Sequence, residues 1–181
     1  MTDELMSEIK VPRTDGSIIT VVGVGGAGGN AVNHMWNLGI RGVTFMVCNT
    51  DQQALDKSPV ERKIRLGSEG LGAGNDPENG RRAAVESLPE IRQVLEEAGT
   101  KMLFITAGMG GGTGTGASPV IAKLAKEMGL LTVAIVTSPL AVEGKIRYEQ
   151  AFRGIEELRQ NTDSLLIINN ENILEIYGRL S

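Results

Sequence analysis

Apolar, β-branched runs alternate with stretches of helical spacing along this chain. The runs lie at 17–23, 43–49, 62–66, 101–106, 130–136 and 164–170. Continuously apolar strands that are separated by helices are typical of a parallel sheet covered on both faces. With right-handed crossovers, the pattern predicts an α/β fold: a doubly wound, Rossmann-like, mostly parallel sheet of about six strands with helices on both faces.

Two of the intervening stretches have the spacing of amphipathic helices. Residues 30–38 predict a helix that stops at Gly39, a residue that commonly follows the last helical turn. Residues 145–160 predict another helix. Its buried stripe is expected to comprise Ile146, Phe152, Ile155 and Leu158.

Two further helices are predicted from their start signals. Ser118 followed by Pro119 is a typical N-cap and first-turn pair, so we expect a helix over 119–128. The stretch 77–98 is interrupted by a proline, but "SLPE" (87–90) has the form of a capping box. We therefore expect a helix, a break and a new helix there.

Glycine-rich segments follow the first and fourth predicted strands: "GVGGAGGN" (23–30) and "AGMGGGTGTG" (107–116). In open parallel sheets, ligands bind at the carboxyl ends of the strands where the strand order reverses, and in the order 3-2-1-4-5-6 that point lies between strands one and four. Backbone N–H groups, helix N-termini and the hydroxyls of Thr113 and Thr115 suit a phosphate. A polyphosphate cradle is the favoured interpretation, and a purely structural turn is the alternative.

Composition narrows the class of protein. The net charge of −4 over 181 residues makes nucleic acid and anionic membranes poor candidates as partners. A single cysteine excludes an internal disulfide and suits a reducing compartment. We expect a cytoplasmic protein with no direct membrane insertion, because no apolar run is long enough to span a bilayer and the start lacks the pattern of a signal peptide.

The motifs alone leave two classes of ligand open. Gly23-x-Gly25-x-x-Gly28 has the dinucleotide fingerprint, and Asp51 stands where an NAD-binding protein has its ribose-binding acid. No Gly-Lys-Ser/Thr follows a glycine loop, so a Walker lysine is absent. An NAD(P)-binding Rossmann enzyme therefore remains an alternative. A triphosphate site here would depend on backbone amides, helix dipoles and Mg²⁺.

Several longer motifs together resemble the tubulin/FtsZ family of GTPases, and in particular its bacterial cell-division members. They run in the family's order through nearly the whole chain: "GVGGAGGNAV" (23–32), "NTDQQAL" (49–55), "GLGAGNDPENGR" (70–81), "AGMGGGTGTGASPVIA" (107–122), "TSPLAVEGKIR" (137–147) and "NNENIL" (169–174). The resemblance implies a GTP-binding domain over 17–181. Residues 1–16 are polar and show no clean periodicity, which predicts a flexible N-terminal arm.

The resemblance also implies a role for individual residues. The phosphates would lie against Gly26, Ala27, Gly28, Gly29 and, in the second segment, Gly110, Gly111, Gly112, Thr113, Gly114, Thr115 and Gly116. The γ-phosphate would be approached by Ala73 and Gly74, with Asn49 and Asp51 near the nucleotide. The ribose and guanine would be held by Pro139, Glu143, Arg147, Asn30 and Asn170.

The resemblance further implies a filament-forming GTPase of cell division that acts at the mid-cell ring. GTP or GDP would be the ligand, Mg²⁺ would be held through the phosphates without direct protein ligands, and the main partner would be a head-to-tail homopolymer. Other cell-division proteins would bind outside this chain. The family's central helix, acidic catalytic loop and C-terminal domain have no counterpart in these residues, so we expect the catalytic residue elsewhere and almost no turnover by this chain alone. A non-hydrolysing regulatory module is the other alternative.

Ordinary structural roles remain open for three acidic residues. Glu143 and Arg147 have the spacing of an ordinary i,i+4 ion pair. Asp51 and Asp76 have the chemistry of local turn caps.

Cys48 is expected to be a small buried apolar residue.

Overall fold

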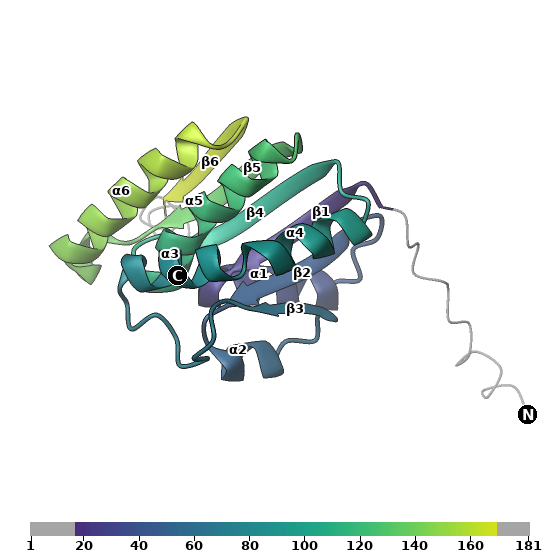
Figure 1. Ribbon diagram of the computed structural model, residues 1–181. Coiled ribbons are helices and arrows are strands. Elements are labelled where there is room, and N and C mark those ends of the chain that lie inside the picture. Colours follow the sequence, from purple (N-terminus) through teal and green to yellow (C-terminus); the bar gives the residue numbers. More distant parts are fainter. Residues whose placement is uncertain (1–16, 170–181) are drawn as a thin grey trace, which may run out of the picture.

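The computed structural model describes residues 17–169 and contains a six-stranded, all-parallel sheet with helices on both faces (Figure 1). The strands are β1 (Ile19–Val24), β2 (Thr44–Asn49), β3 (Arg62–Arg65), β4 (Met102–Gly108), β5 (Leu131–Ser138) and β6 (Ser164–Asn169). The helices are α1 (Gly25–Asn37), α2 (Gln52–Asp56), α3 (Pro77–Glu86), α4 (Leu88–Glu97), α5 (Gly112–Glu127) and α6 (Lys145–Gln160), with a short 3₁₀ helix at Ala141–Glu143. The predicted fold class is confirmed.

The strand order is β3-β2-β1-β4-β5-β6. The chain therefore moves from β1 outward to one edge, returns to β4 beside β1, and then moves to the other edge. This places the reversal of strand order between β1 and β4, as the apolar pattern predicts.

Alternation along the strands divides the core into two parts. On β1, Val22 and Val24 pack with α3, α4, α5 and α6, whereas Val21 packs on the other face with α1 and α2. Figure 1 shows α3 to α6 on the near face of the sheet and α1 behind it. No helix within residues 17–169 has the length and apolar character to cross a membrane.

The C-terminal end of α1 and both ends of α6 match the predictions, but part of the predicted α6 stripe is wrong. Gly39 follows α1 with a φ of 69°, in the left-handed region typical of a helix stop. On α6, Ile155 and Leu158 are buried, whereas Ile146 and Phe152 are 73% and 61% exposed. The buried face instead includes Ala151 and Gly154, small residues that let α6 lie close against α5.

The interrupted helix at 77–98 is confirmed as α3 and α4, but the predicted capping box is wrong. The Ser87 side chain makes no cap hydrogen bond to α4. Its hydroxyl accepts from the backbone N–H of Gly67 at 2.9 Å and lies 3.3 Å from the carbonyl oxygen of Arg65. Ser87 thus holds the chain that leaves β3.

Glycines allow α3 to pack directly onto the start of α5. A Cβ atom at Gly80 would overlap the carbonyl oxygen of Gly112, and one at Gly116 would overlap that of Pro77 and lie 2.7 Å from the Arg81 nitrogen. Backbone thus lies against backbone, with no side chain between the two helices at these points.

We predict that Gly116→Ala destabilises the protein by about 3 kcal/mol, because α3 must move away from α5 to admit the methyl group. Gly29→Ala on α1 is the matched control, because its Cβ would have no atom within 4 Å and helix propensity favours alanine by about 0.5–1 kcal/mol. Urea unfolding followed by circular dichroism measures both. Equal stability of Gly116→Ala and the unaltered protein would contradict this packing.

Candidate functional site

The two glycine-rich segments meet at the carboxyl ends of β1 and β4. The strands are neighbours in register, with Val24 opposite Ala107. Helix α1 begins directly after β1, and α5 begins four residues after the end of β4. A Cβ atom at Gly25 would lie 3.0 Å from the Gly114 nitrogen, so the first turns of the two helices are in contact.

Both helices begin earlier than predicted. The predicted starts are residue 30 for the first helix and Pro119 for the second, but α1 begins at Gly25 and α5 begins at Gly112. Pro119 therefore lies inside α5, and the Ser118 hydroxyl donates to the Gly114 carbonyl at 2.6 Å instead of capping the helix. Apart from Gly25, whose φ is 72°, the glycines of these first turns are helical, and their lack of a Cβ permits the close packing of the two turns.

The first backbone N–H groups of α1 and α5 have no side-chain acceptor. Their N-cap residues, Val24 and Gly111, make no side-chain cap hydrogen bond, and neither first turn contains an acidic residue. By contrast, Asp51 caps α2 and Asp76 caps α3. Uncapped helix N-termini present donors and a partial positive charge, so the pair suits an anion.

The glycines of these turns divide into two groups. Some are required by packing: a Cβ at Gly28 would overlap the Thr106 carbonyl oxygen, and one at Gly114 would overlap that of Gly108. Others face open space, since a Cβ at Gly26 or Gly29 would have no atom within 4 Å. The second group leaves room for a ligand to approach the backbone closely.

A cavity of about 370 Å³ lies between the two helix starts and the end of β5. Of the predicted site residues it is lined by Gly26, Ala27, Gly111, Gly112, Thr113, Gly114, Pro139, Glu143 and Arg147. Thr137 and Ser138, from the end of β5, complete the lining on that side. The hollow therefore has a backbone-rich end at the helices and a charged end at Glu143 and Arg147.

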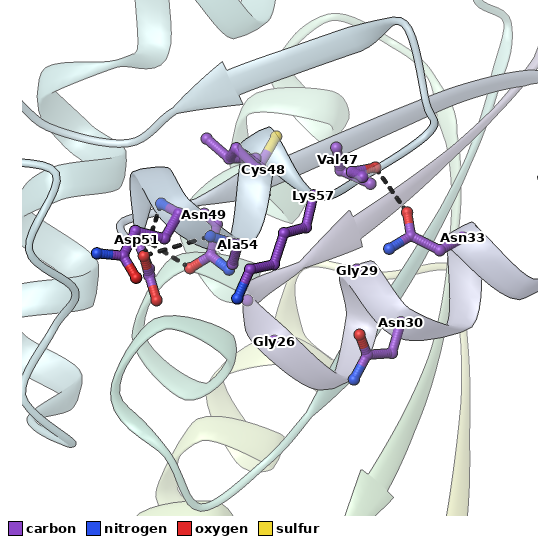
Figure 2. A pocket seen from close by; sticks show the side chains of 14 residues that line it. Gly26, Gly29, Asn30, Asn33, Val47, Cys48, Asn49, Asp51, Ala54 and Lys57 are labelled. Carbon is purple, nitrogen blue, oxygen red and sulfur yellow. Dashed lines mark hydrogen bonds between the residues drawn. The ribbon is translucent and has the colours of Figure 1, made fainter.

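A second cavity of about 230 Å³ lies on the other side of the α1 start, between α1, β2 and α2. It contains the predicted residues Gly26, Gly29, Asn30, Asn49 and Asp51 (Figure 2). Gly26 lines both cavities. In Figure 2 the Lys57 side chain extends across this second cavity, a residue to which the sequence pattern does not point.

The remaining predicted residues that the structure describes line neither cavity. Gly28, Gly110, Thr115 and Gly116 belong to the packed turns, and Ala73 and Gly74 lie on the loop at 70–76. The Thr115 hydroxyl accepts from the Gly110 N–H at 2.7 Å and so closes the turn before α5. Asn170 lies outside the described residues.

The local interpretations of the acidic residues are confirmed. Asp51 Oδ1 accepts from the N–H groups of Gln53 and Ala54 at 2.9 and 3.3 Å, and Asp76 accepts from Glu78 at 2.9 Å. Asp51 nevertheless lines the second cavity.

Glu143 and Arg147 form the ion pair that their spacing predicts, at 2.9 Å, and both line the larger cavity. The pKa of Glu143 is lowered, first by a hydrogen bond from the Leu140 N–H at 2.8 Å and then by Arg147. Glu143 is thus an anion at neutral pH that keeps the Arg147 guanidinium at the rim.

The described residues offer few side chains for acid–base chemistry or for binding a metal ion. Within the part of the chain that the structure describes, no three His, Cys, Asp or Glu side chains gather as a metal site. Burial raises the pKa of the Cys48 thiol, in keeping with the predicted small apolar residue. What the described cavities do offer is the backbone N–H groups at the starts of α1 and α5, which suit an anion.

An ion pair joins α3 and α6, two helices that pack on α5. Arg81 on α3 makes a two-pronged contact with Glu157 on α6, and both of these helices pack on α5. The hydrogen bonds and charge of Arg81 lower the pKa of Glu157 below its unfolded value of 4.5. The stabilisation is therefore fully present above about pH 4.5 and is lost as the pH falls through the lower folded value.

We predict that the unfolding free energy of the protein falls more steeply between pH 5 and pH 3 than that of Glu157→Gln, which lacks this titrating group. Glu156→Gln is the matched control, because it removes an exposed carboxylate one residue away on the same helix. It should follow the unaltered protein. Parallel curves for Glu157→Gln and the unaltered protein, measured by urea unfolding at each pH, would refute the role of the pair.

Comparison with known proteins gives consistent matches. The family model "Tubulin/FtsZ family, GTPase domain" matches residues 18–178. The cell division protein FtsZ of Porphyromonas gingivalis is 52% identical over 183 residues, which cover 99% of this chain and 40% of the relative. That of Bartonella bacilliformis is 56% identical over 161 residues, or 87% of this chain and 27% of the relative.

Solved structures agree in fold. The FtsZ dimer from M. jannaschii superposes with a TM-score of 0.85 at 46% identity, over 89% of this chain and 47% of that one. CetZ2 from Haloferax volcanii, solved as a GTPγS-bound protofilament, gives a TM-score of 0.76 at 28% identity, over 84% of this chain and 49% of that one. The chain thus spans less than half the length of these relatives.

Proposed function

The chain belongs to the tubulin/FtsZ family, and from this membership we propose that it is the nucleotide-binding part of a GTP-hydrolysing, filament-forming protein of cell division. The observation that carries the proposal is the pair of uncapped helix starts at Gly25 and Gly112, which meet beside the larger cavity. Such a site binds a polyphosphate without a Walker lysine.

The polyphosphate would lie across the α1 and α5 starts, with its oxygens facing the open backbone at Gly26 and Gly111. The ribose would lie toward the Glu143–Arg147 pair at the opposite end of the same cavity. A second group of polar residues, Asn30 and Asn49 with Asp51, stands on the far side of Gly26. The residue-by-residue roles given above are retained as proposals on this basis.

Mg²⁺ fits this donor set only through the nucleotide. Magnesium keeps several waters and binds through one or two carboxylates together with phosphates. Both acidic residues that line the described cavities are already engaged: Asp51 accepts two backbone hydrogen bonds, and Glu143 is paired with Arg147. When bound, Mg²⁺ would neutralise phosphate charge, while the chain itself supplies amides and hydroxyls that hold and orient the phosphates.

Self-association is proposed from the same family membership. Of the related structures, that of FtsZ from M. jannaschii is a dimer and that of CetZ2 from Haloferax volcanii is a protofilament. We propose that this chain takes part in a head-to-tail polymer at the division site, and a heterologous, non-closing contact of that kind yields open filaments. Hydrolysis would then depend on residues contributed across the subunit contact.

We predict that GTP at a hundredfold excess over its Kd raises the thermal unfolding midpoint of the chain by about 5–10 °C, whereas NADH leaves the midpoint unchanged. Protection by NADH in place of GTP, measured by differential scanning calorimetry, would overturn the proposed function.

Gly26→Ala should weaken GTP binding by about tenfold, because its methyl group occupies space that the ligand requires while contacting no protein atom.

A further inference from the structure

Thr50 is buried where three segments meet. It follows β2 directly and is only 4% exposed. Its hydroxyl lies 2.7 Å from that of Thr113, in the first turn of α5. Its carbonyl oxygen accepts from the N–H of Gly72 at 3.0 Å. Thr50 therefore links the end of β2 both to the start of α5 and to the loop at 70–76.

The loop at 70–76 is held at both ends. At one end, Gly72 bonds to Thr50, Leu71 pairs with Asp51 in an antiparallel bridge, and Gln52 N–H donates to Gly70 at 3.1 Å. At the other end the loop lies against α5, where a Cβ at Gly112 would be 2.9 Å from the Asp76 nitrogen. Between the anchors, Gly74 has a φ of 60° and open space around it. A change at either anchor therefore acts on this middle part of the loop.

A hydroxyl group has one proton and two acceptor positions, and this limits what Thr113 can do. If Thr113 donates its proton to Thr50, it has none to give to a phosphate oxygen in the cavity that it lines. If Thr50 donates to Thr113, the Thr113 proton is available for the phosphate. A phosphate at this position thus selects one direction of the hydrogen bond, from Thr50 to Thr113 to phosphate, and such chains strengthen one another.

We propose that Thr50 is a positioning residue of the nucleotide site: it holds the Thr113 hydroxyl as a donor to the polyphosphate and passes the occupancy of that position to the loop at 70–76. This inference rests on the proposed function and adds a route of regulation within the same site. It requires only hydrogen bonds that the described residues already make.

The test compares Thr50→Val, Thr50→Ser and Thr113→Val in the full 181-residue chain. Calorimetric titration with GTP should give a three- to tenfold weaker Kd for Thr50→Val and a value within twofold of the unaltered chain for Thr50→Ser. In a Thr113→Val background, Thr50→Val should add less than twofold, because the hydroxyl that it positions is already gone.

The chain offers a matched control for the loss of such a pair. Thr20 and Thr100, at the opposite end of β1, also join their buried hydroxyls at 2.7 Å. Thr20→Val should lower stability as Thr50→Val does but leave the Kd for GTP unchanged. Hydrogen exchange supplies the second measurement: GTP should protect residues 70–76 in the unaltered chain, in Thr50→Ser and in Thr20→Val, and protect them much less in Thr50→Val and Thr113→Val.

The possible results separate the two proposals. No GTP binding by the unaltered chain would contradict the proposed function, and this inference with it. Normal GTP affinity and normal loop protection in Thr50→Val would contradict the inference alone. A loss of affinity that is equally large in the Thr113→Val background would show that Thr50 acts through stability, and would also overturn it.

Discussion

The close contact of backbone with backbone around the start of α5 is the constraint on which this site depends. Gly112, Gly114 and Gly116 each leave no room for a Cβ atom, because the loop at 70–76, β4 and α3 lie directly against them. This contact lets α5 begin at the end of β4 without a capping side chain and touch the first turn of α1. Two helix starts without side-chain caps are thereby brought to one place.

The surrounding residues keep this arrangement in position. Thr115 closes the turn through Gly110, Thr50 ties the turn to β2, and the Arg81–Glu157 pair joins the two helices that flank α5. None of these contacts depends on a ligand, so the donors are oriented before one arrives. Such preorganisation is what an electrostatic site needs, because the cost of ordering its dipoles is met during folding.

Much of the fold could be predicted from the sequence. Continuous apolar runs locate the six strands to within two residues, and the two glycine segments correctly mark the reversal of strand order between β1 and β4. Local sequence signals for helix starts were less reliable where tertiary packing decides where the helix begins. Ser118-Pro119 looks like a helix start, yet the helix begins at Gly112, since tertiary contact overrides the low helix propensity of glycine.

The site could be predicted only in part. The motifs identify only some of the residues that line the two cavities, and sequence spacing does not distinguish the glycines needed for packing, such as Gly28, from those that face open space, such as Gly26. The resemblance implies that residues 49–51 lie near the nucleotide, but the role proposed for Thr50 rests on a hydrogen bond to a residue 63 positions away, which no sequence pattern shows. Long-range partners of this kind become visible only in three dimensions.

We propose that a polyphosphate is held by the backbone amides of two helix starts. The most direct measurement is an amide-resolved NMR titration of the ¹⁵N-labelled chain with GTP. We expect the largest shifts at the amides of residues 25–29 and 110–114 together. Large shifts confined to residues outside both turns, or at only one of the two, would contradict it.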